Sequence, residues 1–413
     1  MSVPENYLVI VRWKSRIMTA VYEHDRLAEL FFDDEDHNIL GNIYVGKVKN
    51  VVKNINAAFM EIGGQQKGYY SLKENQEHFF MNPKKSAAIV PGDELLVQVI
   101  KEPVKTKPAM LSGNIHLTGR DLVLTVHKPS VGISAKITSD EKRQHLKALL
   151  EPKVTPEYGF IARTHSQEAS DEALLFEADR LANEFQELLQ RARFASCFSK
   201  VYSAVPGYIK YILNHPRLEK VTTDIPQVYE NICQTLLARN SRVPVVLYKD
   251  ESWPLVKVKS LQTQIERLLL PQVWLKSGGF LVIQPTEAMV VIDVNTGRYT
   301  GKKAVQETYF KINMEAADEI ARQVRLRNLS GIIIIDFIDM EDAGMRRQLF
   351  EYFKELLKAD PVKTVLVDTT RLNLVEMTRK KERKPIYEIL AEPCSRCHGR
   401  GFIYDLSDLG GQP

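Results

Sequence analysis

Two apolar segments that each end in an aspartate give the clearest pattern of hydrophobic and polar positions in the chain. The first reads Ala-Met-Val-Val-Ile-Asp and ends at Asp293, and the second reads Gly-Ile-Ile-Ile-Ile-Asp and ends at Asp336. Runs of β-branched residues of this length predict buried strands. Between them, residues 303–328 repeat apolar positions every three or four residues, which predicts an amphipathic helix. The pattern therefore predicts a strand–helix–strand unit.

Carboxylates would gather at one edge of this unit. A crossover helix usually joins parallel strands, so both aspartates would lie at carboxyl ends, where open α/β sheets bind ligands. Asn295 follows Asp293 by two residues and shares its face. Such oxygen ligands suit a partly hydrated Mg²⁺. The alternative is that Asp293 and Asp336 cap the segments that follow their strands, a role that we also expect for Asp339 because it would face away from Asp336.

Short alternating segments predict many strands in the first third of the chain. Residues 7–13, 16–23 and 27–32 predict three strands, followed by an acidic run at 33–36. Five further strands, which predict a small closed barrel, are expected at 43–48, 57–62, 68–72, 94–100 and after Met110. Residues 41–47 match G-x-x-x-x-G-K, but no Ser or Thr follows and the residues alternate like a strand, so we do not expect a phosphate-binding loop.

Two aromatic residues of the barrel could contact nucleic acid. Phe59 and Tyr69 would stack unpaired bases if their rings are exposed, and the alternative is that one or both pack in the core. Nearby lysines could neutralise phosphates, namely Lys47, Lys49, Lys53 and Lys67.

The middle of the chain predicts strands at 122–126 and 159–164 and a helix at 170–193. Arg163 and Thr164 end the second strand and could bind an anion, although a solvated arginine is the alternative. The helix has an apolar face made of Leu174, Leu181, Phe185 and Leu188.

Farther along, residues 345–357 predict a helix and residues 364–368 predict a strand. The basic run 379–384 predicts either a solvated helix end or a surface that neutralises a nucleic-acid backbone.

The four cysteines fall into two groups. Cys197 and Cys233 lie in helical patterns and are expected to be reduced core residues. Cys394 and Cys397 form a C-x-x-C motif, followed by the glycines typical of a zinc knuckle. Zinc prefers four ligands and His398 is too close to Cys397 to join them, so we expect a second chain to supply two thiolates. A redox-active pair is the alternative.

Composition restricts the class of protein. The chain has 413 residues, enough for two to four domains, and its net charge of +4 means that any strongly basic surface must be local. It contains neither an apolar run of membrane-spanning length nor an N-terminal signal region, which predicts a cytoplasmic protein without a membrane segment.

Several of these motifs together resemble the bacterial ribonuclease E/G family, in its short, ribonuclease G-like form. The barrel segments are similar to the OB-fold RNA-binding barrel that this family contains. The resemblance is carried by Val-Val-Ile-Asp-Val-Asn-Thr-Gly at 290–297, Glu-Ala-Ala-Asp-Glu-Ile-Ala-Arg-Gln at 315–323, the segment 326–340 and the motif Cys-x-x-Cys-His-Gly-Arg-Gly at 394–401.

The resemblance implies an α+β multidomain architecture. An RNase H-like domain would be interrupted by the OB-fold RNA-binding barrel and a 5′-sensor region, and would be followed by a DNase I-like α/β catalytic domain and a zinc-link with a short tail. The implied boundaries are 1–36 and 209–268 for the two RNase H-like parts, 37–118 for the barrel, 119–208 for the sensor, 269–391 for the catalytic domain and 392–413 for the zinc-link and tail.

The resemblance also implies roles for individual residues. Asp293 and Asp336 would hold catalytic Mg²⁺ with Asn295 orienting them, while Cys394 and Cys397 would hold Zn²⁺ shared between the chains of a homodimer or a higher oligomer. Single-stranded RNA would be held by Phe59, Tyr69 and Lys107. The pocket for the 5′-monophosphate would be lined by Gly119, Val123, Lys136, Arg163, Thr164 and Lys363. Two of these positions, 136 and 363, are lysines where the family is expected to have arginines, so we expect weak 5′-end discrimination.

The implied function is a magnesium-dependent endoribonuclease acting in rRNA maturation and mRNA decay. It would cut single-stranded, A/U-rich RNA by attack of metal-activated water and leave 5′-phosphate and 3′-hydroxyl ends. The alternative is a non-catalytic RNA-binding protein that remodels or protects RNA, with structural rather than catalytic carboxylates.

Overall fold

The structure is a computed structural model whose described residues are 5–34, 39–82, 84, 86–103, 107–215, 218–238, 243–297, 305–392, 394–397 and 401. Parts of the predictions fall outside these residues: the end of the acidic run at 35–36, the start of the predicted helix at 303–304, His398 and the tail beyond 401. The chain forms two compact units, Met1–Asp33 with Arg217–Pro413, and Asp34–Pro216. The first strands therefore fold with the C-terminal half of the chain. Each unit is described by itself.

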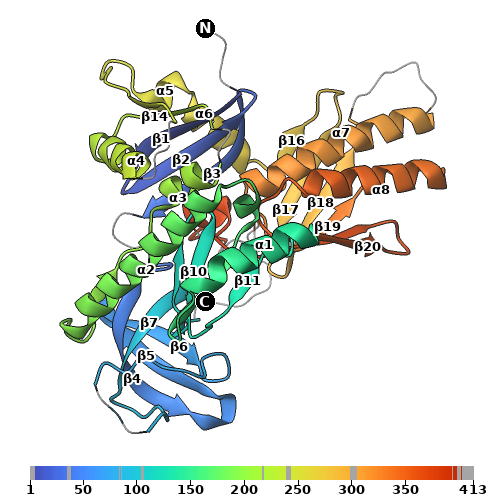
Figure 1. Ribbon diagram of the computed structural model, residues 1–413. Helices are drawn as coiled ribbons and strands as arrows, with labels where there is room; N and C mark the ends of the chain where they lie inside the picture. The colour runs from blue at the N-terminus through green and yellow to red at the C-terminus, as the bar shows by residue number, and fades with distance from the viewer. Residues whose placement is uncertain are drawn as a thin grey trace, which may run out of the picture. The chain divides into compact units, whose positions relative to one another are not determined.

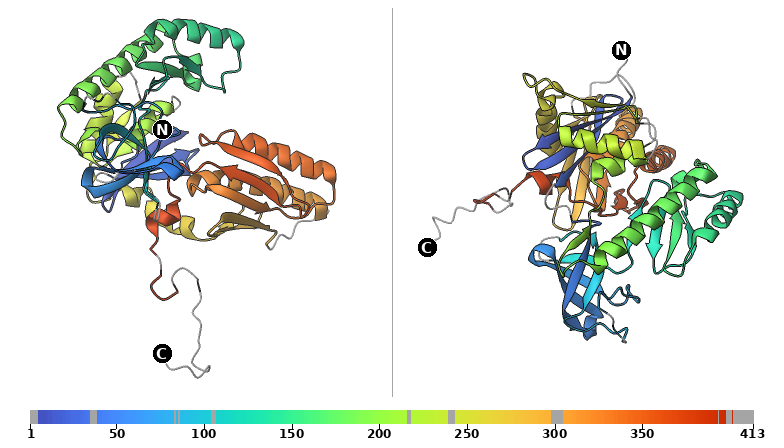
Figure 2. Two further views of the ribbon diagram at one scale, coloured as in Figure 1. Left: turned by 90° about the horizontal axis from the view of Figure 1, so that it is seen from below. Right: turned by 60° about the vertical axis from the view of Figure 1, so that its left-hand side comes forward.

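A closed barrel of five strands lies in the unit 34–216. Its strands are β4 (Ile43–Val52), β5 (Ala57–Ile62), β6 (Gln66–Ser71), β7 (Glu94–Lys101) and β8 (Ala109–Ser112), and β7 pairs back with β4 to close the ring. They are the lighter blue to cyan strands of Figures 1 and 2, where Figure 1 labels β4, β5, β6 and β7. The predicted barrel is confirmed, because alternate residues such as Met60 and Val97 fill its core. The strand β13 (Lys200–Tyr202) pairs with β4, and the short 3₁₀ helices η1 (Lys53–Ile55) and η2 (Gly63–Gln65) follow β4 and β5.

The G-x-x-x-x-G-K match belongs to this barrel. Gly46 lies within β4, and a side chain there would come within 3.1 Å of Ile62 and 3.2 Å of Val97. The glycine therefore permits close packing inside the barrel, and the prediction that these residues are not a phosphate-binding loop is confirmed.

A second sheet in the same unit has the order β11 (Val131–Ile133), β12 (Tyr158–Ala162), β10 (Leu122–Val126) and β9 (His116–Thr118). The helix α2 (Asp171–Arg193) packs on it through the predicted apolar face, whose four residues are all buried. Ser170 caps α2 by accepting a hydrogen bond from the Ala173 amide, which satisfies one free N–H of the first turn. The remaining helices of the unit are α1 (Asp140–Leu150), η3 (Glu151–Lys153), η4 (Thr164–Gln167) and α3 (Gly207–Asn214).

In the other unit, the N-terminal strands form a five-stranded sheet with two later strands. Its order is β15 (Val245–Leu247), β14 (Lys220–Thr223), β1 (Asn6–Trp13), β2 (Arg16–Glu23) and β3 (Arg26–Asp34). The three predicted N-terminal strands are confirmed. The helices of this region are α4 (Pro226–Ala238), α5 (Leu255–Val258) and α6 (Leu261–Leu269).

The two acidic strands lie in a six-stranded sheet of that unit. The order is β16 (Gln272–Trp274), β17 (Phe280–Pro285), β18 (Met289–Asn295), β19 (Gly331–Asp336), β21 (Val375–Arg379) and β20 (Thr364–Thr369). The helix α7 (Val305–Leu326) connects β18 to β19, and this pair is parallel while the neighbouring pairs are antiparallel. The predicted strand–helix–strand unit is confirmed.

Helices cover one face of this sheet. Residues Val290, Ile292 and Val294 of β18 are buried in one apolar cluster with residues of α7 and of α8 (Ala343–Leu357), two helices that run side by side in Figure 1. The alternate residues, including Asp293 and Asp336, point to the opposite face and are half-buried or exposed. The pleat therefore places both carboxylates on the face that these helices leave open.

The helix α7 also joins this sheet to the N-terminal sheet. The guanidinium of Arg325 forms ion pairs with Glu23 and Glu29, and Arg26 forms an ion pair with Glu319 at 3.0 Å. Because Arg325 and Glu319 are largely buried, these ion pairs fix the helix in one orientation on the strands, although Arg26 itself is exposed.

One prediction for the basic run is wrong. Arg379 does not end a solvated helix; it is the last residue of β21 and is 4% exposed. Its Nε donates to an Asp360 carboxylate oxygen at 2.7 Å and its guanidinium also donates to Asn328 at 2.8 Å. Residues 380–384 are exposed, and the short helix α9 (Ile386–Leu390) follows them.

Among the described residues, no helix combines the length and apolar character needed to cross a membrane.

Candidate active site

Asp293 and Asp336 are direct neighbours on the parallel strands β18 and β19. Strand spacing places their Cα atoms about 4.8 Å apart. Asp293 is half-buried near the end of β18, and Asp336 is exposed as the last residue of β19. The predicted convergence of the two carboxylates at one sheet edge is therefore present in the structure.

Asn295 lies on the same face as Asp293 and contacts it directly. Its side-chain amide donates to an Asp293 carboxylate oxygen at 2.7 Å, which holds that carboxylate in one orientation. Gly297, with φ of 59°, turns the chain away immediately afterwards, and a side chain at this position would come within 2.1 Å of the Gly278 carbonyl oxygen. Only glycine fits here without strain.

The Asp336 carboxylate does not act as a helix cap. The residue that caps α8 is Asp342, whose carboxylate accepts a hydrogen bond from the Met345 amide at 2.7 Å. No residue in the described part of the chain donates a hydrogen bond to the Asp336 side chain. The geometry therefore disfavours a capping role and leaves this carboxylate available for a ligand.

The carboxylates at this edge of the sheet repel one another. Partial burial, then the charges of Asp293 and Asp339, raise the pKa of Asp336 above its ordinary value. The expectation for Asp339 depended on a strand that continues past Asp336, but β19 ends there. Asp339 accepts a hydrogen bond from Asn373 at 3.2 Å and lies close enough for its charge to act on Asp336. The edge therefore carries three acids within electrostatic range.

These oxygen ligands suit Mg²⁺, which keeps bound water, better than they suit a metal ion whose ligands all come from the protein. Over the described ranges, no three His, Cys, Asp or Glu residues converge closely enough to enclose an ion. Two adjacent carboxylates on an open face would leave several positions for water and phosphate oxygens, which is how magnesium is usually bound. A divalent cation would also relieve the repulsion that raises the Asp336 pKa.

The barrel aromatics Phe59 and Tyr69 lie side by side on the adjacent strands β5 and β6. Both are half-buried, neither belongs to the barrel core, and their ring centroids are 6.0 Å apart at an angle of 73°. Among the predicted phosphate-binding lysines, Lys47 and Lys49 form ion pairs with Glu94 and Glu61, at 3.7 Å and 2.5 Å. Exposed pairs of this kind are weak, so phosphates could compete for these lysines. Lys53, Lys67 and Lys107 are exposed.

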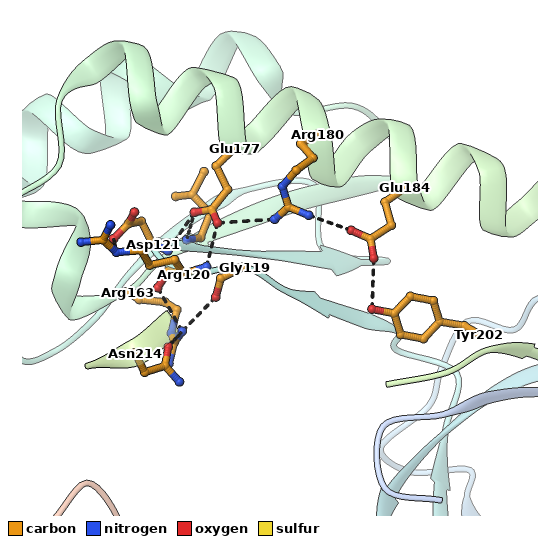
Figure 3. A network of polar contacts seen from close by, with 10 residues as sticks. Gly119, Arg120, Asp121, Arg163, Glu177, Arg180, Glu184, Tyr202 and Asn214 are labelled. Atoms are coloured by element: carbon orange, nitrogen blue, oxygen red, sulfur yellow. Dashed lines mark hydrogen bonds and ion pairs between the residues drawn. The ribbon is translucent and has the colours of Figure 1, made fainter. Parts of the chain in front are cut away.

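Two of the predicted 5′-phosphate residues of the unit 34–216, Gly119 and Arg163, lie beside a polar network that includes residues of α2 (Figure 3). Glu177 is buried and its carboxylate accepts from the backbone amides of Arg120, Asp121 and Leu122 at 2.7 to 3.0 Å. A side chain at Gly119 would come within 2.3 Å of the Glu177 carboxylate. Gly119 therefore permits this backbone loop to wrap around the carboxylate, which sequence reasoning did not foresee.

Arg163 is anchored by the same loop. Its NH1 donates to the carbonyl oxygens of Gly119 and Arg120 at 2.9 and 3.0 Å and to the Asn214 side chain at 2.9 Å (Figure 3). Burial lowers the Arg163 pKa, and the nearby carboxylates of Glu177 and Asp121 oppose that effect. The alternative of a solvated arginine is wrong, because the side chain is half-buried and bound on one edge.

The other predicted pocket residues are dispersed around this anchor. The Thr164 hydroxyl lies 3.1 Å from the Ser134 hydroxyl, Val123 is half-buried on β10, and Lys136 is exposed. Lys363 is exposed and belongs to the other unit, so its place in a shared pocket stays a prediction.

Two of the cysteines differ from expectation. Cys197 lies in a turn between α2 and β13 rather than in a helix, and Cys233 lies in α4; both are half-buried rather than core residues. Cys394 is exposed and Cys397 is half-buried, and neither forms a disulfide.

Comparison with known proteins decides the family. A model described as the ribonuclease E/G family matches residues 116–382, which include every strand of the sheet that carries Asp293 and Asp336. The chain belongs to the ribonuclease E/G family. The predicted resemblance is therefore confirmed, and with it the prediction of an endoribonuclease.

Individual relatives of this family cover nearly the whole chain. Ribonuclease G of Haemophilus influenzae is 36% identical over 401 residues, which are 93% of this chain and 81% of that protein. Ribonuclease G of Escherichia coli K12 is 34% identical over 88% of this chain and 77% of its own length. Ribonuclease E of Synechocystis is 32% identical over 96% of this chain but only 60% of its own length.

Sequence reasoning missed one element of this ribonuclease E/G site, the hairpin β16–β17 beside Asn295. Glu315 of α7 holds its turn by accepting from the backbone amides of Lys276 and Ser277 at 2.5 and 3.1 Å. The adjacent glycines at 278–279 were the available signal, because paired glycines predict a turn.

Proposed function

We propose that this member of the ribonuclease E/G family is a magnesium-dependent endoribonuclease that cuts single-stranded, A/U-rich RNA in rRNA maturation and mRNA decay. It would leave 5′-phosphate and 3′-hydroxyl ends. The observation that carries the proposal is the pairing of Asp293 with Asp336 at the carboxyl ends of two parallel strands, on a face that α7 and α8 leave open.

The residues at this edge of the sheet would have different roles in cleavage. Asp293 and Asp336 would hold Mg²⁺, which when bound supplies an activated water and stabilises charge on the phosphate. Asn295 holds the Asp293 carboxylate oxygen at 2.7 Å, so that one ligand is already oriented before RNA arrives. The exposed Asp336 faces solvent on the side from which a phosphodiester can approach.

The barrel would supply affinity for unpaired RNA. Half-buried rings at Phe59 and Tyr69 can stack bases, and stacking requires bases that are not already paired in a duplex. Lys107 and the lysines of β4 and β6 would contact phosphates. This combination supports a preference for single strands but contains no group that selects adenine or uracil, so that preference rests on the family resemblance.

The 5′-end would be sensed by the region around Arg163. Its anchored NH1 fixes the guanidinium plane and leaves the opposite edge for a phosphate, beside the Thr164 hydroxyl. Gly119 and Val123 would form the wall of this pocket, and Lys136 and Lys363 would add charge. Lysine cannot form the bidentate contact of arginine, so we propose weak dependence on the 5′-monophosphate.

The cysteine motif would link two chains through zinc. Cys394 and Cys397 provide two thiols, and the described residues bring no third His, Cys, Asp or Glu to them. A complete tetrahedral site therefore needs ligands from elsewhere, which two further thiols of a second copy would supply in a homodimer or higher oligomer.

The decisive test compares Asp293→Asn and Asp336→Asn with wild type on a 5′-monophosphorylated single-stranded RNA, with and without Mg²⁺. We expect both variants to lose cleavage while their RNA affinity, measured by fluorescence anisotropy, changes little. Asp368→Asn, an exposed acid on the edge strand β20, is the matched control and should cleave normally. Full activity in either variant would contradict the assignment, and a triphosphorylated RNA in parallel measures the 5′-end preference.

A further inference from the structure

An exposed tryptophan and a half-buried phenylalanine form an aromatic pair on the open face of the sheet that carries Asp293 and Asp336. Trp274 on the edge strand β16 is 65% exposed, and its ring centroid lies 5.3 Å from that of Phe280 on β17, with the planes at 56°. Tryptophan is usually buried for most of its surface, so an indole that stands out on a sheet needs an explanation.

The strand register places this pair beside the carboxylates. Trp274 pairs with Phe280, which pairs with Asn295, so the three side chains form one row across the same face of the sheet. The adjacent row contains Asp293 and Asp336. With strands about 4.8 Å apart and rows about 7 Å apart, the Cα atoms of Phe280 and Trp274 lie about 8 and 12 Å from that of Asp293.

The pair is held rigidly. The turn after Trp274 is fixed to α7 by Glu315, which accepts from the amides of Lys276 and Ser277, and Leu275 donates to the Gly279 carbonyl at 2.8 Å. A side chain at Gly279 would come within 2.8 Å of the Asn295 carbonyl oxygen, so the turn packs directly against the strand end that carries Asn295. A preorganised ring binds a ligand with little loss of conformational entropy.

We propose that Trp274, supported by Phe280, is a stacking platform for an unpaired RNA base next to the scissile phosphate. The proposal rests on the proposed function of the Asp293–Asp336 edge. An RNA strand whose phosphate lies over the carboxylates and which runs toward β16 brings the base of a flanking nucleotide over the indole. Every base has a π-face, so the platform positions the strand without selecting a sequence. Trp274 is thus a positioning residue rather than a catalytic one.

The test combines protein variants with RNA that lacks single bases. Trp274→Ala should lower kcat/KM for a short RNA with one cleavage site by roughly five- to 150-fold, the range of base–aromatic stacking. Trp274→Phe should retain most activity because a ring remains. Trp253→Ala is the matched control, since Trp253 is 62% exposed in the same unit but lies in the segment between β15 and α5 and belongs to no strand of this sheet.

Abasic substitutions then locate the stacked base. Moving one abasic nucleotide along the RNA should reveal a position near the cut where wild-type cleavage falls by a factor similar to that of Trp274→Ala. The same substitution should cause no further loss in Trp274→Ala. Unchanged kcat/KM in a folded Trp274→Ala variant, or equal additional losses at every abasic position, would overturn the platform.

A binding measurement separates this proposal from the proposed function. In the cleavage-deficient Asp336→Asn background, RNA should quench tryptophan fluorescence in Trp253→Phe but much less in Trp274→Phe. Equal quenching in the two would contradict stacking on Trp274 even if the enzyme is a magnesium-dependent ribonuclease. Conversely, if Asp336→Asn still cleaves RNA, the proposed catalytic role of Asp336 is wrong. The fluorescence measurement then tests only whether an RNA base stacks on Trp274. If Trp274→Ala fails to fold, the quenching comparison between Trp253→Phe and Trp274→Phe still decides the question.

Discussion

Replacing Asp336 with asparagine should stabilise the metal-free protein while it abolishes cleavage. Partial burial and the carboxylates of Asp293 and Asp339 raise the Asp336 pKa, so the folded protein binds this proton more tightly than the unfolded chain does. The stabilisation from protonated Asp336 is complete below the unfolded pKa and is lost as pH rises through the higher folded pKa. At neutral pH the ionised side chain therefore opposes folding, and a neutral amide removes that effect.

The strand geometry sets the size of this effect. Two unit charges about 4.8 Å apart interact by about 3.5 kcal/mol at an effective dielectric constant of about 20, and by about 0.9 kcal/mol in bulk water. Because Asp336 is exposed, solvent screening brings the value toward the lower limit, about 1 kcal/mol. For a unit of this size, that corresponds to a rise in Tm of about 2–4 °C.

The assay is thermal unfolding of wild type and Asp336→Asn in a chelator and in Mg²⁺, across acidic to neutral pH. In chelator, the Tm advantage of the variant should be small near the ordinary pKa of aspartate and grow toward neutral pH. Added Mg²⁺ should raise the Tm of wild type more than that of the variant, because the ion binds two carboxylates only in wild type. Equal Tm values in chelator at neutral pH, or an equal gain from Mg²⁺ in both proteins, would refute the reasoning; Asp368→Asn controls for general loss of charge.

Two further predictions concern the rest of the chain. Arg379→Met should lower the free energy of unfolding by about 3–5 kcal/mol in denaturant titrations, because it leaves the buried Asp360 carboxylate without its ion pair. The control is Lys380→Met, a substitution of the exposed neighbouring residue, which should change the free energy of unfolding very little. Equal effects of the two substitutions would contradict the burial argument. Cys394→Ser should lower both the zinc content, measured by mass spectrometry, and the assembly size, measured by light scattering, and zinc retained at full stoichiometry by a monomer would contradict the shared site.

The sequence predicted those parts of the fold in which apolar residues form a run or a regular period. The parallel strands β18 and β19 are continuous β-branched runs, the helix α7 repeats apolar positions every three or four residues, and the five barrel strands are short apolar segments between turns. The edge strand β16 was not predicted because three residues are too few to show a period. Its position depends on the contact of Glu315 with the turn, 38 residues or more away along the chain.

Polar side chains were harder to place, because their surroundings come from distant parts of the chain. The basic residues at 379–384 suggested a solvent-exposed segment. Arg379 is instead buried and donates a hydrogen bond to Asp360, 19 residues earlier in the chain. Arg163 looked like either an anion ligand or a solvated residue, and the structure shows it bound to carbonyl oxygens 43 and 44 residues away. A sequence pattern gives the face on which a residue lies but not the partners that it meets there.

The arrangement around Arg163 bears on how strongly a 5′-phosphate could influence cleavage. Because NH1 is held by the Gly119 and Arg120 carbonyls and by Asn214, the guanidinium offers a phosphate only its remaining edge. The family resemblance assigns two further cationic residues to the proposed pocket, and both are lysines, Lys136 and Lys363, which act as mobile point charges rather than as planar forks. A phosphate in such a pocket gains charge attraction but few directed hydrogen bonds. If the proposed function holds, contacts of the rest of the RNA with the barrel and with the open face of the sheet that carries Asp293 and Asp336 would therefore contribute more to recognition than the 5′-end does.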